Sequence, residues 1–166
     1  MEKNITYSFQ PVQQLFLSAI LADSYIRDTY YLTGGTALAA CYFNHRLSED
    51  IDLFSTQKLD EPRIVQLISE HIGPIATKID YVRIRDRLAY TITFPHKKNL
   101  KVDIVYYPYA PIEQSKRTYK GLVIDSMADI GVNKLMTLTQ RTETKDYVDL
   151  YYILKKYTIL ELRQGG

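Results

Sequence analysis

The chain has 166 residues, of which 46% are hydrophobic, and this favours one domain with its own core. A formal net charge of +2 does not indicate a strong polyanion binder, although the average would hide a local basic patch. The single cysteine, Cys41, excludes an intramolecular disulfide and a cysteine-rich zinc site. The sequence has no apolar run near the ~18 residues of a membrane span and no signal-peptide core. We therefore expect a cytoplasmic protein without a membrane partner.

Hydrophobic periodicity predicts helices alternating with short strands in the first half of the chain. In order, these are a helix over 11–28, a strand over 30–33, a helix over 36–44, a strand over 50–54 and a helix over 61–72. Strands over 78–85 and 88–94 then form a hairpin, followed by strands over 101–107 and 121–124 and helices over 127–141 and 145–157. This order predicts an α+β fold with a mixed sheet, flanking helices and a C-terminal helical pair at about 127–160, in one domain over 1–166.

Acidic and apolar side chains alternate in two of the predicted strands. Asp50 and Asp52 share one face of their strand, because successive side chains point to opposite faces. Two neighbouring carboxylates repel each other unless a cation lies between them, and Mg²⁺ is a hard cation that accepts such oxygens. If the strand over 101–107 lies alongside, Asp103 joins the pair, and three carboxylates can hold two Mg²⁺ ions. The alternative is a solvated strand face paired with nearby lysines.

The sequence Gly34-Gly35-Thr36 lies where a predicted strand gives way to a helix. Glycines allow a positive φ and a close approach of the backbone to a ligand, and a helix N-terminus attracts phosphate. The hydroxyl of Thr36 could cap the helix or donate to a phosphate oxygen. The turn matches neither the P-loop nor the Rossmann pattern, so a phosphate cradle and a plain tight turn both remain open.

Basic and acidic side chains are paired in the C-terminal part. Lys134 and Arg141 are seven residues apart, which places them on one face of the predicted helix, either facing phosphates or solvated at the surface. Asp146 and Asp149 share a face of the next helix, and we expect Asp146 to orient Lys134 or Arg141 rather than to bind metal. Arg46, in the loop before the first acidic strand, is expected to contact phosphates, to brace the aspartates or to form a structural ion pair.

Together these motifs resemble the core of the DNA-polymerase-β-like nucleotidyltransferases, and more narrowly the AbiEii/AbiGii toxin family. The matching blocks are GGTAL at 34–38, HRLSEDIDL at 45–53, a later strand aspartate at 103, D-x-x-x-x-K over 129–134 and R-x-x-x-K-D-x-x-D-L over 141–150. They extend over most of the chain. The first two blocks are the most specific part of the resemblance, and the C-terminal pair adds to it.

The resemblance implies a nucleotidyltransferase fold and Mg²⁺-dependent transfer of a nucleotide from an NTP to an acceptor hydroxyl. The acceptor would be RNA such as a tRNA 3′ end, and the protein would be a toxin with a cognate antitoxin. Catalysis and metal binding would fall to Asp50, Asp52 and Asp103, and nucleotide binding to Gly34, Gly35, Thr36, Arg46, Ser48, Lys134 and Arg141, with Asp146 in support. Two alternatives remain: an inactive nucleotide- or protein-binding module of the same fold, and a purely structural interaction domain.

Overall fold

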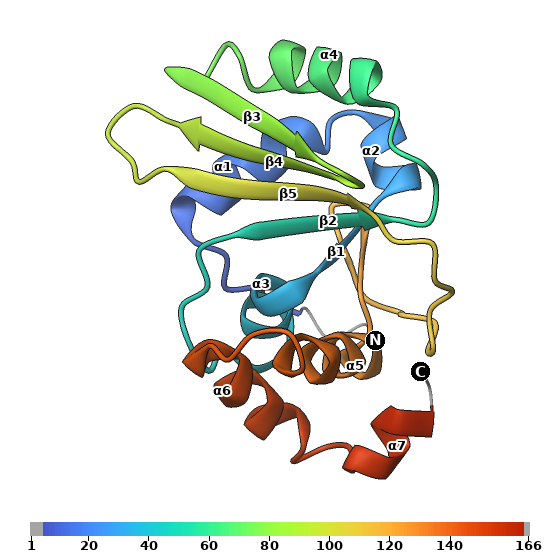
Figure 1. Ribbon diagram of the computed structural model, residues 1–166. Helices are drawn as coiled ribbons and strands as arrows, with labels where there is room; N and C mark the ends of the chain where they lie inside the picture. Colours follow the sequence, from blue (N-terminus) through green and yellow to red (C-terminus); the bar gives the residue numbers. More distant parts are fainter. Residues whose placement is uncertain (1–4, 165–166) are drawn as a thin grey trace.

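The computed structural model describes residues 5–164, so the first four and last two residues of the predicted domain lie outside the description. The strands are β1 (Tyr31–Thr33), β2 (Ile51–Ser55), β3 (Lys78–Ile84), β4 (Arg87–Thr93), β5 (Leu100–Tyr106), β6 (Thr118–Tyr119) and β7 (Leu122–Ile124). The helices are α1 (Pro11–Ile20), α2 (Ser24–Thr29), α3 (Gly34–Leu38), the π-helical η1 (Ala39–Phe43), α4 (Glu61–His71), α5 (Met127–Leu138), α6 (Thr144–Ile153) and α7 (Ile159–Gln164). The predicted α+β class with a mixed sheet is confirmed (Figure 1).

The sheet has the strand order β3-β4-β5-β2-β1-β7-β6, and β2 lies near its centre. Strand β2 pairs antiparallel with β1 and parallel with β5. Ile51 and Leu53 of β2 and Val102 of β5 are fully buried, so these apolar side chains fix which face of each strand turns toward the core. The acidic residues between them therefore lie on the other face, and Asp52 pairs in register with Asp103.

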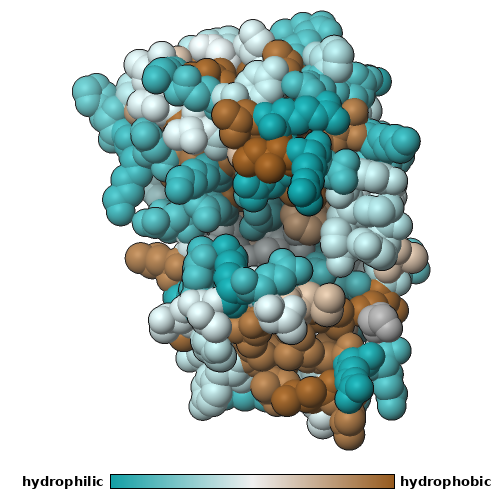
Figure 2. All heavy atoms as spheres, viewed as in Figure 1, coloured by the Kyte–Doolittle hydropathy of each residue, from teal (hydrophilic) through white to brown (hydrophobic). Residues whose placement is uncertain are grey.

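The helices position the remaining parts of the site. In Figure 1, α4 lies at one end of the molecule and α5, α6 and α7 lie at the other. Helix α3 packs against both α5 and α6, so the C-terminal helices are joined to the sheet where β1 enters α3. Figure 2 shows hydrophobic residues gathered on the lower part of the face viewed in Figure 1, where the C-terminal helices lie. Exposed apolar side chains in and after α6 include Leu154, Ile159 and Leu160.

The strands and α4 differ from their predicted ranges by one residue at most at each end, whereas four predicted helices differ in a way that has a structural cause. The helix predicted over 11–28 is two helices, because Asp23 caps α2 by accepting a hydrogen bond from the backbone N–H of Tyr25. The helix predicted over 36–44 begins earlier, at Gly34, and continues through η1 to Phe43, after which Asn44 has a left-handed φ of 48°. The helix predicted over 127–141 ends at Leu138, so Arg141 lies beyond it.

The last predicted helix stops at Ile153, and α7 follows as a separate short helix that the sequence did not reveal. The two-residue strand β6 was also missed. It pairs antiparallel with β7, and Gly121, with a φ of 84°, turns the chain back between the two strands. Between residues 5 and 164 no helix combines the length and the apolar character needed to cross a membrane.

Candidate active site

The turn from β1 into α3 brings backbone directly against an acidic side chain. Gly34 has a φ of +76°, a left-handed conformation that side chains other than glycine rarely adopt. A Cβ at Gly34 would collide with the carboxylate of Asp52, and one at Gly35 would collide with the guanidinium of Arg46. The φ of Gly34 favours glycine there, and both glycines leave space for a side chain that lines the cleft between β2 and α3.

Three carboxylates form one wall of this cleft. Asp52 and Asp103 are register partners on parallel strands, and Asp50 lies just before β2. Burial, with repulsion from Asp103 and Asp50, raises the pKa of Asp52 to about 7. Burial also raises the pKa of Asp103, against the attraction of Arg87, whose Nη1 lies 3.7 Å from the Asp103 carboxylate. We call Asp50, Asp52 and Asp103 the acidic wall. The raised pKa values of Asp52 and Asp103 mean that neighbouring cations do not fully compensate the negative charge of this wall.

The donor set of the acidic wall suits a hard divalent cation, because it consists of carboxylate oxygens that repel one another. Among residues 5–164, no three acidic, histidine or cysteine side chains already stand close enough to enclose a metal ion. The carboxylates would have to turn toward one another as the ion binds. Asp50, Asp52 and Asp103 are the residues here that could hold such a cation.

The cleft between the sheet and helices α5 and α6 has a volume of about 520 Å³. Most of the predicted site residues line it: Gly34, Gly35, Arg46, Ser48, Asp50, Asp52, Asp103, Lys134 and Arg141. The basic side chains Arg46, Lys134, Arg141 and Lys145 also line it and provide positive charge. The structure thus brings an acidic and a basic group of side chains to one cavity.

A buried ion cluster lies behind the cleft. The carboxylate of Asp149 is fully buried and accepts hydrogen bonds from Arg46 Nε at 2.6 Å, Arg46 Nη2 at 2.7 Å and His45 Nε2 at 2.7 Å. Lys134 Nζ lies 2.7 Å from Asp149 and 2.8 Å from Asp146. Burial alone raises the pKa of Asp149, but the hydrogen bonds from Arg46 and Lys134 outweigh it and hold this pKa below its usual range. The cluster joins the loop before β2 to α5 and α6.

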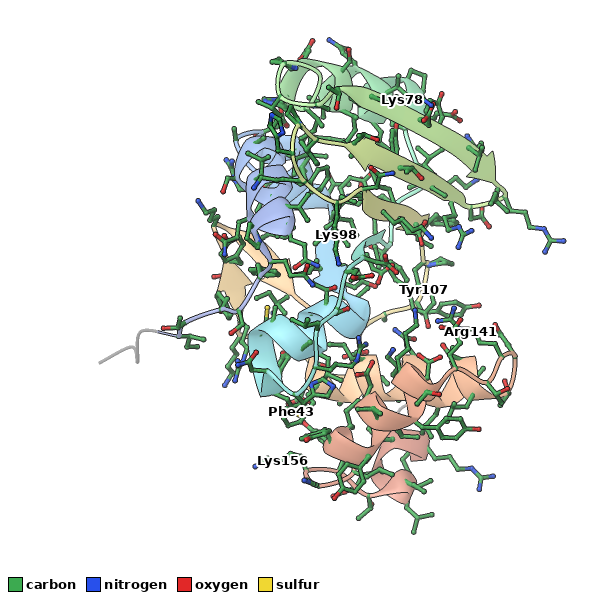
Figure 3. All side chains as sticks on the ribbon, turned by 90° about the vertical axis from the view of Figure 1, so that its left-hand side faces the viewer. Phe43, Lys78, Lys98, Tyr107, Arg141 and Lys156 are labelled. Carbon is green, nitrogen blue, oxygen red and sulfur yellow. The ribbon has the colours of Figure 1, made fainter. Side chains whose placement is uncertain are left out.

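Asp146 contacts both of the bases that it was expected to orient. It is buried in the first turn of α6, accepts a hydrogen bond from Lys134, and lies 3.5 Å from Arg141 Nε. Arg141 follows the end of α5, so the argument that a shared helix face joins it to Lys134 was wrong, although both side chains line the cleft. In Figure 3 Arg141 lies on the same side of the molecule as Tyr107, nearer the C-terminal helices.

Two predicted nucleotide-binding residues have other contacts in the structure. Thr36 is buried and does not line the cleft: its hydroxyl donates to the backbone oxygen of Asp50 and is hydrogen-bonded to Ser48 Oγ at 2.8 Å. The backbone oxygen of Ser48 accepts a hydrogen bond from Gln13 at 2.7 Å, so α1 also holds this loop. Arg46 pairs with Asp149 and not with the acidic wall. Thr36 and Arg46 therefore brace the loop that leads into β2.

Several residues of the site had no role assigned to them from the sequence. Asp149 and His45 carry the buried cluster, and Lys145, Asn133 and Phe54 line the cleft. Phe54 directly follows the motif block at 45–53, and the others lie within the blocks at 45–53, 129–134 and 141–150, so those blocks were the available signal. Periodicity could not assign them, because their contacts join segments about 100 residues apart.

The fold belongs to the class of nucleotidyltransferase folds. The chain resembles the Helicobacter pylori protein JHP933 over 95% of this chain and 74% of that one, with a TM-score of 0.68 and 25% sequence identity. It resembles the antibiotic-resistance factor ANT(2'')-Ia over 94% of this chain and 90% of that one, with a TM-score of 0.63 and 16% identity. It resembles the Megavirus polyadenylate synthase over 90% of this chain and 33% of that one, with a TM-score of 0.57 and 16% identity.

The particular family follows from the sequence. Residues 15–164 match the family model described as "Nucleotidyl transferase AbiEii toxin, Type IV TA system", and the chain belongs to this family. An uncharacterized Aquifex aeolicus protein, aq_aa25, is 29% identical over 133 residues, which make up 80% of this chain. The matched segment covers 61% of that relative's length. The predicted family resemblance is confirmed.

Proposed function

We propose that this chain is a Mg²⁺-dependent nucleotidyltransferase, which transfers a nucleotide from an NTP to an acceptor hydroxyl. The observation that carries the proposal is the register of β2 and β5, which sets Asp52 opposite Asp103 on one wall of a cleft. Gly34 packs against Asp52 at the mouth of α3, and basic side chains line the same cavity. Family membership supports this chemistry over a purely structural role.

The charges of the cleft match the parts of a metal-bound nucleotide. Lys134, Arg141 and Lys145 offer cations to the phosphates, while the acidic wall offers oxygens to a metal. Lys134 has three ammonium hydrogens, and its two carboxylate partners leave one free to point into the cleft. The glycine turn leaves room for phosphate beside Asp52, because a side chain at Gly34 would fill that space.

The residues of the cleft would have separate roles in an in-line displacement at the α-phosphorus. When bound, Mg²⁺ would neutralise the acidic wall and polarise the α-phosphate. Asp103, at the edge of the wall, is the carboxylate we assign to accept the proton of the acceptor hydroxyl as its oxygen attacks the α-phosphorus. The bond from the α-phosphorus to the bridging oxygen breaks, and pyrophosphate leaves toward Lys134 and Arg141. Positioning and charge neutralisation are the main demands of such a reaction.

The acceptor we propose is RNA, such as a tRNA 3′ end, and the biological role is that of a toxin with a cognate antitoxin. Both rest on the family to which residues 15–164 belong. The reaction would take place in the cytoplasm, where NTPs and tRNA occur together. We propose that residues 1–166 form one nucleotidyltransferase unit, in which α5 and α6 line the cleft opposite the sheet.

The test is transfer of labelled nucleotide. The purified chain is incubated with MgCl₂, an RNA pool and each labelled NTP in turn, and labelled RNA is measured. We expect product with at least one NTP, and Asp52→Asn should lower its rate by roughly 100-fold or more, because a charge that stabilises the transition state is removed. Asp80→Asn is the matched control, since Asp80 lies on β3 and its carboxylate is 57% exposed.

The outcomes separate the alternatives. Transfer that falls with Asp52→Asn but not with Asp80→Asn supports the proposal. NTP binding by calorimetry without any transfer would instead identify an inactive binding module of this fold. Neither Mg²⁺ nor NTP binding would leave only a structural interaction domain and overturn the proposal.

A further inference from the structure

A second cavity adjoins the cleft and differs from it in chemistry. Its volume is about 670 Å³, and it shares Phe54, Asn133 and Thr137 with the cleft, so the two cavities lie side by side. Four basic side chains line the cleft, whereas none of the described residues that line the second cavity is basic. Phosphate groups therefore have partners in the cleft but none in this side pocket, which suits an uncharged group.

Aromatic rings form one side of the side pocket. The ring of Phe54 lies 5.4 Å from that of Tyr107, and Tyr107 lies 4.8 Å from Tyr109. Tyr107, labelled in Figure 3, is fixed because its hydroxyl donates to Asn133 Oδ1 at 2.8 Å. Tyr109 is 64% exposed, so most of its surface is free to contact a ligand. A row of rings ending in an exposed tyrosine is suited to stacking on a flat ring.

The acidic residue of the side pocket is already occupied by the protein. Asp129 accepts hydrogen bonds from the backbone N–H groups of Ile112 at 2.8 Å and Glu113 at 3.1 Å, and it also pairs with the hydroxyl of Ser126. These bonds fix the segment after Tyr109 to the start of α5. The side pocket therefore has an anchored wall, and Asn133 and Gln140 are the amides that line it beside the rings.

We propose that this side pocket holds the base of the incoming nucleotide, stacked on Tyr109, while the triphosphate occupies the cleft. The inference rests on the proposed function, because it places the same NTP. The inference is supported by the different linings of the two cavities. The cations and the acidic wall line the cleft, whereas aromatic rings and amides line the side pocket. Asn133 and Thr137, shared by both cavities, then lie beside the sugar. Gln140 is the amide side chain that can read the edge of the base, since Asn133 Oδ1 already accepts a hydrogen bond from Tyr107.

The experiment compares ligands with and without a base. Calorimetry in MgCl₂ measures the affinities of ATP, GTP, CTP and UTP, and that of inorganic tripolyphosphate. Tyr109→Ala should weaken the best-bound NTP by roughly 5- to 100-fold through lost stacking and leave tripolyphosphate binding unchanged. Tyr109→Phe keeps the ring and should retain NTP affinity. Tyr151→Ala is the matched control, because Tyr151 is a 61% exposed tyrosine that lines neither cavity.

Each outcome bears on one proposal. Selective loss of NTP affinity in Tyr109→Ala supports the base pocket. Unchanged NTP affinity in that variant overturns the inference while leaving the proposed function in place. If single-stranded RNA binding falls instead of NTP binding, the pocket serves the acceptor, and the inference is also overturned. Failure of the unmodified chain to bind either NTP or tripolyphosphate would remove the proposed function itself.

Discussion

Replacing Asp149 by asparagine removes the charge that joins the parts of the cleft. Asp149 is fully buried on α6 and faces two cations, Arg46 and Lys134, in addition to His45. An asparagine of nearly the same shape keeps the packing, but among the described residues it leaves Lys134 paired with Asp146 alone and Arg46 without a carboxylate partner. The variant therefore isolates the electrostatic part of the contact between the loop before β2 and the C-terminal helices.

The expected loss is large because the partners are desolvated. Breaking a buried ion pair from one side costs about 3–5 kcal/mol, mainly through the charge that is left unpaired. For a chain of this size, that corresponds to a fall in Tm of roughly 6–20 °C. Asp80→Asn, which breaks only the exposed ion pair with Lys78, should change the free energy of unfolding by no more than about 1 kcal/mol.

The pH dependence gives a second, independent readout. The pKa of Asp149 lies below its usual range in the folded state, so its ionised form stabilises the fold. The advantage of the unmodified chain over Asp149→Asn should be complete above the unfolded pKa of about 4 and should shrink as the pH falls through the lower folded pKa. Urea unfolding at pH 7, 5, 4 and 3 measures it. An Asp149→Asn variant as stable at pH 7 as Asp80→Asn would refute the reasoning.

Two further substitutions test the turn and the end of β7. Gly34→Ala should lower the free energy of unfolding by about 1–3 kcal/mol, because alanine is strained at a left-handed φ and its Cβ displaces Asp52. It should also reduce the rise in Tm that Mg²⁺ causes. Thermal melts in which Mg²⁺ raises the Tm of the variant as much as that of the unmodified chain would contradict this. Burial raises the pKa of Asp125 to about 7, so its charge destabilises the fold as the pH rises. The free energy of unfolding of Asp125→Asn, relative to that of the unmodified chain, should therefore rise by up to about 4 kcal/mol between pH 4 and pH 8. The same difference between the two chains at pH 4 and at pH 8 would contradict this.

Alternation and family pattern together predicted the acidic wall. Because strand side chains alternate, burial of Ile51 and Leu53 is enough to place Asp52 on the cleft face. The adjacency of β2 and β5 could not be derived from periodicity, since strand order depends on contacts across the whole chain. It was a condition of the sequence argument, and the observed register meets it.

The contacts of the buried cluster could not be predicted from local sequence patterns. Lys134 and Arg141 were placed on one helix face by their spacing, but α5 ends three residues before Arg141. What unites them is Asp146, a residue of another helix whose carboxylate contacts both. Thr36 has a hydroxyl suited to phosphate, yet its hydrogen bond to Ser48 uses it to hold a loop. In each case a tertiary partner, which no local window contains, determined the role.

The two walls of the cleft are balanced in different ways, and this difference has a functional consequence. The bases Lys134 and Arg46 are held by buried acids behind them, so their positions are fixed before any ligand arrives. Asp52 has no such partner, and a pKa of about 7 means that ionising it without a cation is costly near neutral pH. A metal that removes this cost also adds positive charge beside the bases. Metal and triphosphate should consequently bind more tightly together than either does alone, as expected when each ligand reduces the electrostatic cost of binding the other.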